Sequence, residues 1–161
     1  MNNFVQAMNL IAENCNIAMQ DKEKFIAKAS KKMQDELSGY NANFEEIFAN
    51  KVANNCYNSP IEIQNINFYS HCKHHFSPII GKIAVSYTPN KWIIGFSRII
   101  QCVNAFTKRL QLQEELTVQI AQEIFTKLEA KSVTVTIVAQ HYCMQHTPNE
   151  ALPEIKTVHT I

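Results

Sequence analysis

The segment that decides the fold is residues 133–143, which read VTVTIVAQHYC. Apolar and polar side chains alternate through most of this run, and a period of two predicts a half-buried β-strand of about ten residues. Side chains two apart point to the same face, so the apolar series from Val133 to Ala139 continues into His141 and Cys143. The strand therefore leads from a hydrophobic core to a polar end. For the histidine and cysteine alone, a core histidine beside a buried thiol is the simpler interpretation.

The segments before this strand predict the rest of the sheet and its cover. Apolar residues recur at helical spacing over residues 99–110 and again over 116–128, which predicts two amphipathic helices. Residues 82–88 alternate as a strand does, 61–66 read as a strand with an interruption, and 156–161 predict a short last strand. Two helices between strand pairs imply an antiparallel sheet with both helices on one face, which is an α+β fold.

The N-terminal third is predicted to be helical. Residues 3–18 and 23–37 each place apolar side chains at helical spacing, and each predicts an amphipathic helix. The polar, asparagine-rich residues 41–60 predict a short helix and a loop. We therefore divide the chain into an N-terminal helical region, residues 1–60, and a second domain that contains the sheet, residues 61–161.

Composition excludes several classes of protein. The chain has 161 residues, of which 46% are hydrophobic, and this suits one compact core. Its 15 basic and 14 acidic side chains leave a net charge of +1, so we expect neither nucleic acid nor a membrane surface as a partner. No apolar stretch is long enough to span a bilayer, and the N-terminus lacks the apolar run of a secretory signal. We expect a cytoplasmic protein with free thiols rather than disulfides.

A second group of metal-binding residue types follows the predicted strand that ends near Tyr69. Residues 72–75 read CKHH, and the two residues between Cys72 and His75 give a spacing shared by many zinc sites. Taken alone, this group is explained equally well by a pair of solvent-exposed histidines. This group indicates a metal site only if it lies close to His141 and Cys143 at the polar end of the later strand.

Together the two groups predict a metal centre. Cys72, His75 and Cys143 would supply three soft or borderline ligands, and three protein ligands leave zinc a fourth position for water, as in catalytic sites. Thiolate and imidazole favour Zn²⁺ over Mg²⁺ or Ca²⁺, which prefer oxygen ligands. A structural site would need a fourth protein ligand. The residues leave four candidates open for that place: His71, His74, His141 and Cys102.

The run FYSHCKHHFSP over residues 68–78 resembles the zinc-binding turn of GTP cyclohydrolase I, written FYSxCEHHxxP. Further matched blocks follow in the same order and at the family's spacing: Gly81–Lys82, Tyr87–Asn90, Ile94–Arg98, Arg109–Thr117 and His141–Met144. The N-terminal helices resemble the family's first domain more loosely. The resemblance implies the tunnelling fold for the catalytic domain. It also implies a homo-oligomeric ring, typically a decamer, with active sites between subunits.

The resemblance also implies a reaction and the residues that perform it. Cys72, His75 and Cys143 would bind Zn²⁺, which would activate the water that attacks the guanine ring of GTP. His74 and His141 would transfer protons during ring opening and the release of formate, a task that suits a histidine. Ring closure would then give 7,8-dihydroneopterin triphosphate, a precursor for pterins.

Substrate recognition is implied for two further groups. Gln113 and Glu114 match the family's guanine-recognising pair, in which the carboxylate accepts hydrogen bonds from the purine. Ser97 and Arg98 lie at a predicted helix start, where a hydroxyl, a guanidinium and free backbone N–H groups suit a triphosphate. GTP or a related purine nucleotide is therefore the expected substrate.

Lysines of the N-terminal helix complete the implied phosphate site. Lys28 and Lys31 match the family's basic pair on that helix, and Lys24 is an alternative because the register is loosely fixed there. The other interpretation of any one of these lysines is an ordinary solvated helix face. The resemblance alone therefore supports their role in binding phosphate.

Three residues depart from the family's pattern. Lys73 stands where the family has a glutamate, and Gln101 and Thr147 stand where it has arginines. A charge-assisted hydrogen bond contributes about 1.5–3 kcal/mol, so the loss of two arginines predicts weaker GTP binding. This pattern fits a weak cyclohydrolase, a relative that acts on another purine or pterin, or a non-catalytic ring-forming paralogue. The resemblance also implies a longer last strand than residues 154–161 provide.

Overall fold

The chain forms two compact units. The computed structural model describes residues 3–145, 147 and 151–161. The two units are Met1–Ser38 and Gly39–Ile161. The division that we predicted after residue 60 distinguishes a helical region from a domain that contains the sheet. It is a different kind of division from these compact units, and it stays a prediction. Within the described residues, none of the helices is both long enough and apolar enough to cross a membrane.

The first unit is a pair of helices joined by a tight turn. Helix α1 spans Asn3–Asn14 and helix α2 spans Met19–Glu36, so both predicted helices are present, and α1 ends earlier than predicted. The cause is Asn16, whose φ of 49° is a left-handed conformation that asparagine tolerates better than most residues. The two helix ends are joined by an ion pair, in which Nζ of Lys22 lies 3.2 Å from Oε1 of Glu13.

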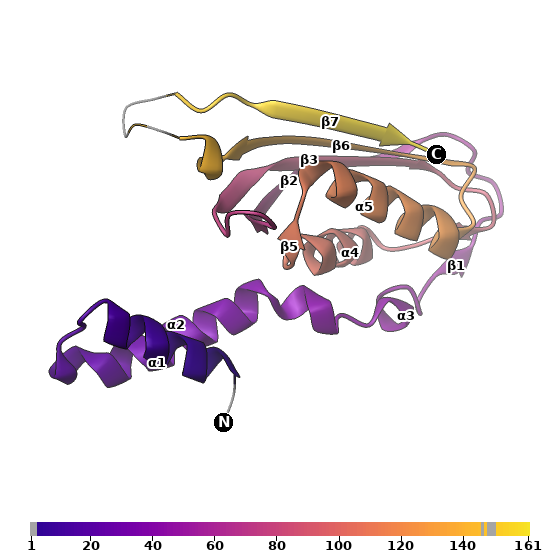
Figure 1. The fold of residues 1–161 in the computed structure, drawn as a ribbon. Coiled ribbons are helices and arrows are strands. Elements are labelled where there is room, and N and C mark those ends of the chain that lie inside the picture. The colour runs from indigo at the N-terminus through magenta and orange to yellow at the C-terminus, as the bar shows by residue number, and fades with distance from the viewer. Residues whose placement is uncertain (1–2, 146, 148–150) are drawn as a thin grey trace. The chain divides into compact units, whose positions relative to one another are not determined.

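The second unit is built on a five-stranded sheet with the strand order β5-β2-β3-β6-β7. The strands span Ile61–Cys72 (β2), Pro78–Thr88 (β3), Leu110–Gln111 (β5), Ser132–His141 (β6) and Ile155–Thr160 (β7). All neighbouring strands are antiparallel except β5, which runs parallel to β2. Helices α4, Phe96–Thr107, and α5, Gln113–Leu128, cover one face of this sheet (Figure 1). This is the predicted α+β arrangement.

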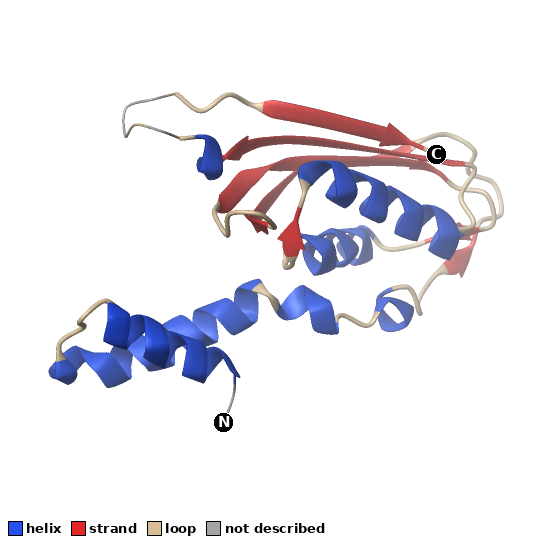
Figure 2. Ribbon diagram, in the orientation of Figure 1, coloured by secondary structure: helices blue, strands red, loops and turns tan. Residues whose placement is uncertain are grey.

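Short elements connect these parts (Figure 2). They are η1 (Ser38–Asn41), α3 (Phe44–Ile47), β1 (Val52–Ala53), β4 (Trp92–Ile93) and η2 (Tyr142–Met144). Strands β1 and β4 pair as a separate antiparallel ribbon. Helix α3 begins after Asn43, whose side chain accepts a hydrogen bond from the backbone N–H of Glu46, as an N-cap residue does. The prediction of a short helix and a loop before residue 60 is confirmed.

The core lies between the sheet and the helices α4 and α5, and the contact between β6 and α5 is a large part of it. The alternating residues of β6 that were predicted to face inward are buried, from Val133 to Ala139. The helical stripe of α5, from Leu116 to Leu128, is also buried. Burying a large aliphatic side chain contributes about 1.5–3 kcal/mol, so this contact fixes the position of α5 on the sheet. The functional groups at the end of β6 and the start of α5 are held by that contact.

A bulge in β2 determines which residues face the core at its end. The pairing register of β2 with β3 shifts between Ile63 and Ile66, and Asn65 has a φ of 59°. The predicted interruption of this strand is confirmed. Because a bulge resets the alternation of side chains, Phe68 and Cys72 share the buried face beyond it. The strand also runs past its predicted end near residue 69.

The prediction that residues 99–110 form one helix was wrong at its C-terminal end. Helix α4 ends at Thr107, and Leu110 belongs to strand β5, where it pairs with His71 of β2. The Arg109 guanidinium is held on the ring of Phe106, 4.8 Å from its centroid. Pairing with the edge of β2 and this cation–π contact stabilise an extended backbone where the periodicity of side chains suggested another helical turn.

Candidate active site

The first part of the site is the turn between β2 and β3. The backbone N–H of Cys72 donates to the carbonyl of Ser77 at 2.7 Å, and the N–H of Phe76 donates to the carbonyl of Cys72 at 2.9 Å. Phe76 has a φ of 57°, a left-handed conformation that reverses the chain tightly. The reversal brings Nδ1 of His75 to 3.6 Å from Sγ of Cys72. The predicted CxxH pair therefore converges.

The second part is the end of β6. His141 is the last residue of this strand and pairs with Ile79 at the start of β3, which places it beside the β2–β3 turn. The 3-10 turn η2 follows directly and carries Cys143. As a result, the ligand atoms of Cys72, His75 and Cys143 all lie within 4.8 Å of one another. The structure brings together the three side chains predicted to bind the metal.

The geometry of this group suits a tetrahedral ion. Two ligands at about 2.3 Å (sulfur) and about 2.1 Å (nitrogen) from one tetrahedral zinc lie roughly 3.6 Å apart, and the Cys72–His75 separation is 3.6 Å. Cys72 is buried, Cys143 is half-buried and His75 is exposed, so one side of the group is open to solvent. Cys102, considered as a fourth ligand, is buried in α4 and is not part of this group.

The chemistry of the donors also favours a cation. Burial, followed by the neighbouring sulfur of Cys72, raises the pKa of the Cys143 thiol. Two sulfurs this close resist a double negative charge unless a positive ion compensates it. A bound metal supplies that compensation, because coordinating thiols are deprotonated. The residues present therefore fit Zn²⁺.

His141 is held beside this group by a buried glutamine. Its Nε2 lies 2.7 Å from Oε1 of Gln113, the first residue of α5, whose exposed fraction is 1%. Burial lowers the pKa of His141, and the nearby Glu114 carboxylate partly opposes this effect. Burial therefore favours the neutral form of this imidazole. Glu114 itself is exposed, whereas the side chain of Gln113 is directed into the protein.

His74 and Lys73 occupy the outer side of the turn. Both are exposed, and the His74 ring stands edge-on to His75 with centroids 6.0 Å apart. The backbone N–H of Lys73 donates to the carbonyl of Gln111 at 3.0 Å. Its Nζ lies 3.3 Å from Oε2 of Glu115 in the first turn of α5. The lysine that departs from the family's glutamate therefore ties the turn to α5.

The Lys73–Glu115 pair makes a stability prediction. Because both side chains are about half exposed, we expect Lys73→Glu, which juxtaposes two carboxylates, to lower the free energy of unfolding by at most about 1 kcal/mol. The double variant Lys73→Glu/Glu115→Lys should recover most of the loss, since it restores opposite charges. Urea unfolding of the single and double variants measures this coupling. Additive losses in the double variant would contradict it.

The predicted phosphate-binding residues lie on two helices. Ser97 and Arg98 are in the first turn of α4, where Ser97 is exposed. The Arg98 guanidinium donates to Oε1 of Gln101 on the same helix at 3.1 Å, so it contacts the residue that replaces the family's arginine. Thr147, the second such position, is exposed. The metal group and these residues all belong to the second unit.

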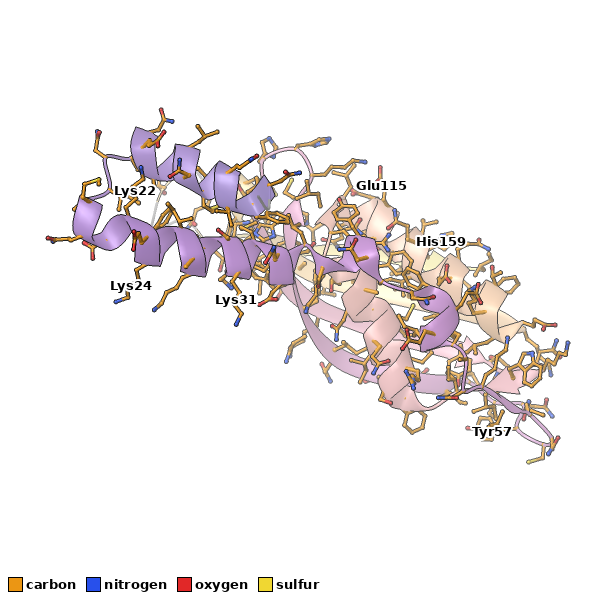
Figure 3. The ribbon with its side chains drawn as sticks, turned by 90° about the horizontal axis from the view of Figure 1, so that it is seen from below. Lys22, Lys24, Lys31, Tyr57, Glu115 and His159 are labelled. Carbon is orange, nitrogen blue, oxygen red and sulfur yellow. The ribbon has the colours of Figure 1, made fainter. Side chains whose placement is uncertain are left out.

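The predicted lysines belong to the first unit. Lys24, Lys28 and Lys31 are exposed on α2, and their spacing places them along one side of a helix. Figure 3 shows Lys24 and Lys31 projecting from the same side of α2. They form a basic stripe on this unit. Their contact with phosphate stays a prediction.

Two features of the site were not predicted from the sequence. One is the Lys73–Glu115 ion pair, and the other is the role of Thr117 and Thr157 in hydrogen bonding around Gln113. Gln113 and Thr117 are four residues apart, a spacing at which helical residues are neighbours, but Gln113 lies before the helix predicted over residues 116–128. No sequence pattern points to Thr157, because it lies on another strand.

Comparison with solved structures defines the class of fold. The crystal structure of the archaeosine synthase QueF-Like in its apo form matches with a TM-score of 0.53 and 18% identity, over 63% of this chain and 92% of that chain. At this level of identity the likeness concerns the fold alone. The chain has the tunnelling fold, as the resemblance implied.

The family follows from the sequence comparison. The family model described as GTP cyclohydrolase I matches residues 4–160, so this chain belongs to the GTP cyclohydrolase I family. Proteins named GTP cyclohydrolase 1 are similar to it. That of Bartonella henselae is 41% identical over 136 residues, or 83% of this chain and 65% of that protein. That of Campylobacter jejuni is 42% identical over 108 residues, or 67% of this chain and 57% of that protein. The chain thus spans less than two thirds of the length of these relatives.

Proposed function

We propose that this chain is a zinc-dependent GTP cyclohydrolase I, which converts GTP and water to 7,8-dihydroneopterin triphosphate and formate. The observation that carries the proposal is the convergence of Cys72, His75 and Cys143, whose ligand atoms lie within 4.8 Å of one another. The similarity to proteins named GTP cyclohydrolase 1 supports the same reaction.

The three ligands would hold the metal and leave one side of it open. When bound in a site of this kind, Zn²⁺ supplies a Lewis acid that activates water near neutral pH. Cys72 is the last residue of β2, and Cys143 lies in the η2 turn directly after β6, so the two strands hold both thiols in position. His75 faces solvent, which suits a ligand at the entrance of the site.

Proton transfer is assigned to His141 and His74. His141 lies at the end of β6, two residues before Cys143, and is fixed by its 2.7 Å hydrogen bond to Gln113. As a neutral imidazole it can take up a proton when the guanine ring opens and return one when formate leaves. His74 is exposed next to His75, and it would transfer protons to and from the substrate groups that lie nearer to solvent.

Substrate binding is assigned to the starts of two helices and to the basic stripe. The exposed Glu114 carboxylate would accept hydrogen bonds from the guanine N–H groups, beside Gln113. Ser97 and Arg98 would bind the triphosphate, together with Lys28 and Lys31. The first N–H groups of a helix favour negative charge, and both α4 and α5 present such a start.

The assembly and its setting are part of the proposal. We expect a homo-oligomeric ring, a decamer as is typical of the family, and a cytoplasmic location. Strand β7 lies at the edge of the sheet, and an open edge is a ready surface for pairing with a second copy. Neither nucleic acid nor a membrane is expected as a partner, because the net charge is +1.

Turnover of GTP tests the proposal directly. The protein loaded with zinc and mixed with GTP should yield formate and, after oxidation, a fluorescent pterin. The same protein stripped of metal by a chelator should yield neither product, and added zinc should restore both. Absence of product from a folded, zinc-loaded protein would overturn the proposal.

A less phosphorylated purine is the second candidate substrate. The observation that favours it is the neutral Gln101 in the place of the family's arginine, which Arg98 contacts through a hydrogen bond of 3.1 Å. Thermal shifts with guanosine, GMP and GTP at equal concentration separate the two candidates, because a ligand that binds more tightly stabilises the folded protein more. A triphosphate site should give the largest shift with GTP.

Replacement of Gln101 tests whether the missing arginine at this position weakens the binding of phosphate. Gln101→Arg adds a guanidinium one turn after Ser97, and a charge-assisted hydrogen bond contributes about 1.5–3 kcal/mol. We expect the Kd for GTP to fall by about tenfold or more, with a smaller change for guanosine. Gln101→Met is the matched control, since it has similar length and no charge. Equal GTP affinity in the Arg and Met variants would contradict the prediction.

A further inference from the structure

A buried amide joins the catalytic histidine to the edge of the sheet. Nε2 of Gln113 lies 2.9 Å from the carbonyl oxygen of Ile155, 3.1 Å from Oγ1 of Thr157 and 3.3 Å from the carbonyl oxygen of Ile137. Backbone carbonyls only accept hydrogen bonds. The NH₂ group of Gln113 must therefore face β6 and β7, which leaves Oε1 facing His141 at 2.7 Å. These neighbours fix the orientation of the amide.

The hydroxyl groups in this network have one consistent direction. Oγ1 of Thr117 lies 2.6 Å from the backbone carbonyl of Gln113 and therefore donates its single proton to it. Oγ1 of Thr157 lies 2.7 Å from Oγ1 of Thr117 and must donate to that oxygen. Thr157 is thus an acceptor toward the Gln113 amide. Each of these side chains is satisfied, as a buried polar network requires.

The direction of the network determines the state of the histidine. Oε1 of Gln113 is an acceptor, so the ring nitrogen that contacts it must carry a proton. We propose that Gln113 is a positioning residue that locks His141 in the tautomer with the proton on Nε2 and a bare Nδ1. In a neutral imidazole one nitrogen donates and the other accepts. Proton exchange with the substrate then takes place at Nδ1. The catalytic consequence rests on the proposed function, whereas the tautomer itself does not.

This assignment adds a role to the one implied by the family resemblance. Gln113 has an exposed fraction of 1%, and both ends of its amide are engaged inside the protein. A side chain used in this way orients a neighbouring group. Because two of its partners, Ile155 and Thr157, belong to the edge strand β7, the orientation of His141 depends on the docking of that strand.

The wild-type protein provides the first test. Nitrogen-15 NMR of the histidine rings, in the zinc-loaded protein at a pH where His141 is neutral, distinguishes a protonated from a bare ring nitrogen. The His141 signals are assigned by their loss in His141→Asn. We expect Nε2 to be the protonated nitrogen and Nδ1 to be bare. The opposite tautomer, or a mixture of both, would overturn the proposal without the need for any variant at position 113.

Two variants of Gln113 give a matched comparison. Gln113→Met keeps the approximate length and removes the acceptor, so we expect a mixture of tautomers and a fall in kcat of about tenfold, part of the 10²–10⁴-fold that acid–base catalysis contributes. Gln113→Glu keeps an acceptor oxygen, so Nε2 should stay protonated. A single Nε2–H tautomer in a folded Gln113→Met variant would contradict the proposal.

The outcomes separate this proposal from the proposed function. A protein with the expected tautomer and no turnover of GTP would leave the positioning role intact and remove the cyclohydrolase activity. A protein that turns over GTP with a bare Nε2 would do the reverse. Zinc content and urea unfolding, measured on each variant, identify any loss of kcat that comes from the metal or the fold.

Discussion

Replacing Cys143 by serine should strip the protein of most of its zinc and abolish turnover of GTP. Cys143 is the one member of the metal group that comes from the η2 turn after β6, since Cys72 and His75 lie at the β2–β3 turn. Serine supplies a hydroxyl, which is a far poorer ligand for zinc than a thiolate. Loss of outer partners of metal ligands alone costs about 10–100-fold in affinity, so loss of a ligand should exceed about 100-fold.

Metal analysis and GTP turnover on the same preparation measure this effect. We expect zinc well below stoichiometric amounts after dialysis, and a fall in kcat of about 10³-fold or more, because activation of water by the metal is lost. Cys56→Ser is the matched control, as it makes the same chemical change at an exposed thiol outside the group. Full zinc content in a folded Cys143→Ser variant would show that the three residues do not share an ion.

The fold was predicted where the side-chain pattern is regular. Strand β6 and the C-terminal end of helix α5 match their predicted bounds closely because their buried residues recur at periods of 2 and 3.6, which backbone geometry imposes. Helix α5 begins three residues before its predicted start, at Gln113. The pattern failed at Leu110, an apolar residue in helical register that lies in a strand. There the pairing of Leu110 with His71 of β2 determines the extended backbone. The local sequence around Leu110 cannot predict this pairing, because the partner strand is distant in the sequence.

The candidate site was predictable to a similar degree. The metal group depends on residue types at fixed spacing, and the paired strands bring its two parts together. The environment of Gln113 was not predictable, because its partners Ile155 and Thr157 come from β7 across the sheet. Comparison with the family's motif identified the positive charge at Lys73, but it did not predict that Glu115 would form an ion pair with this lysine. Contacts between elements require the register of the sheet and the rotation of each helix, which short motifs do not contain.

Replacing Gly81 by alanine should destabilise the second unit more than any other conservative change considered above. Gly81 pairs with Ala139 within the β3–β6 ladder, two pairs from the Ile79–His141 pair at its end. A Cβ atom at this position would lie 2.2 Å from the carbonyl oxygen of Val138 and 2.6 Å from both Cα and Cβ of Ala139. Two of these three atoms are backbone atoms held by pairing on both sides of β3 and β6, so they cannot move away as a flexible side chain would.

The expected loss is about 3 kcal/mol of unfolding free energy, at the upper end for overpacking in a well-packed core. For a chain of this size that corresponds to a fall in Tm on the order of 10 °C, measurable by circular dichroism. Gly95→Ala is the matched control, because no heavy atom lies within 4 Å of the added Cβ at this helix N-cap, and its change should stay within about 1 kcal/mol. Equal stability of the two variants would mean that β3 and β6 are not in this register. The ends of the same two strands position Cys143 and the β2–β3 turn, so Gly81→Ala should also weaken the proposed zinc binding, whereas Gly95→Ala should not.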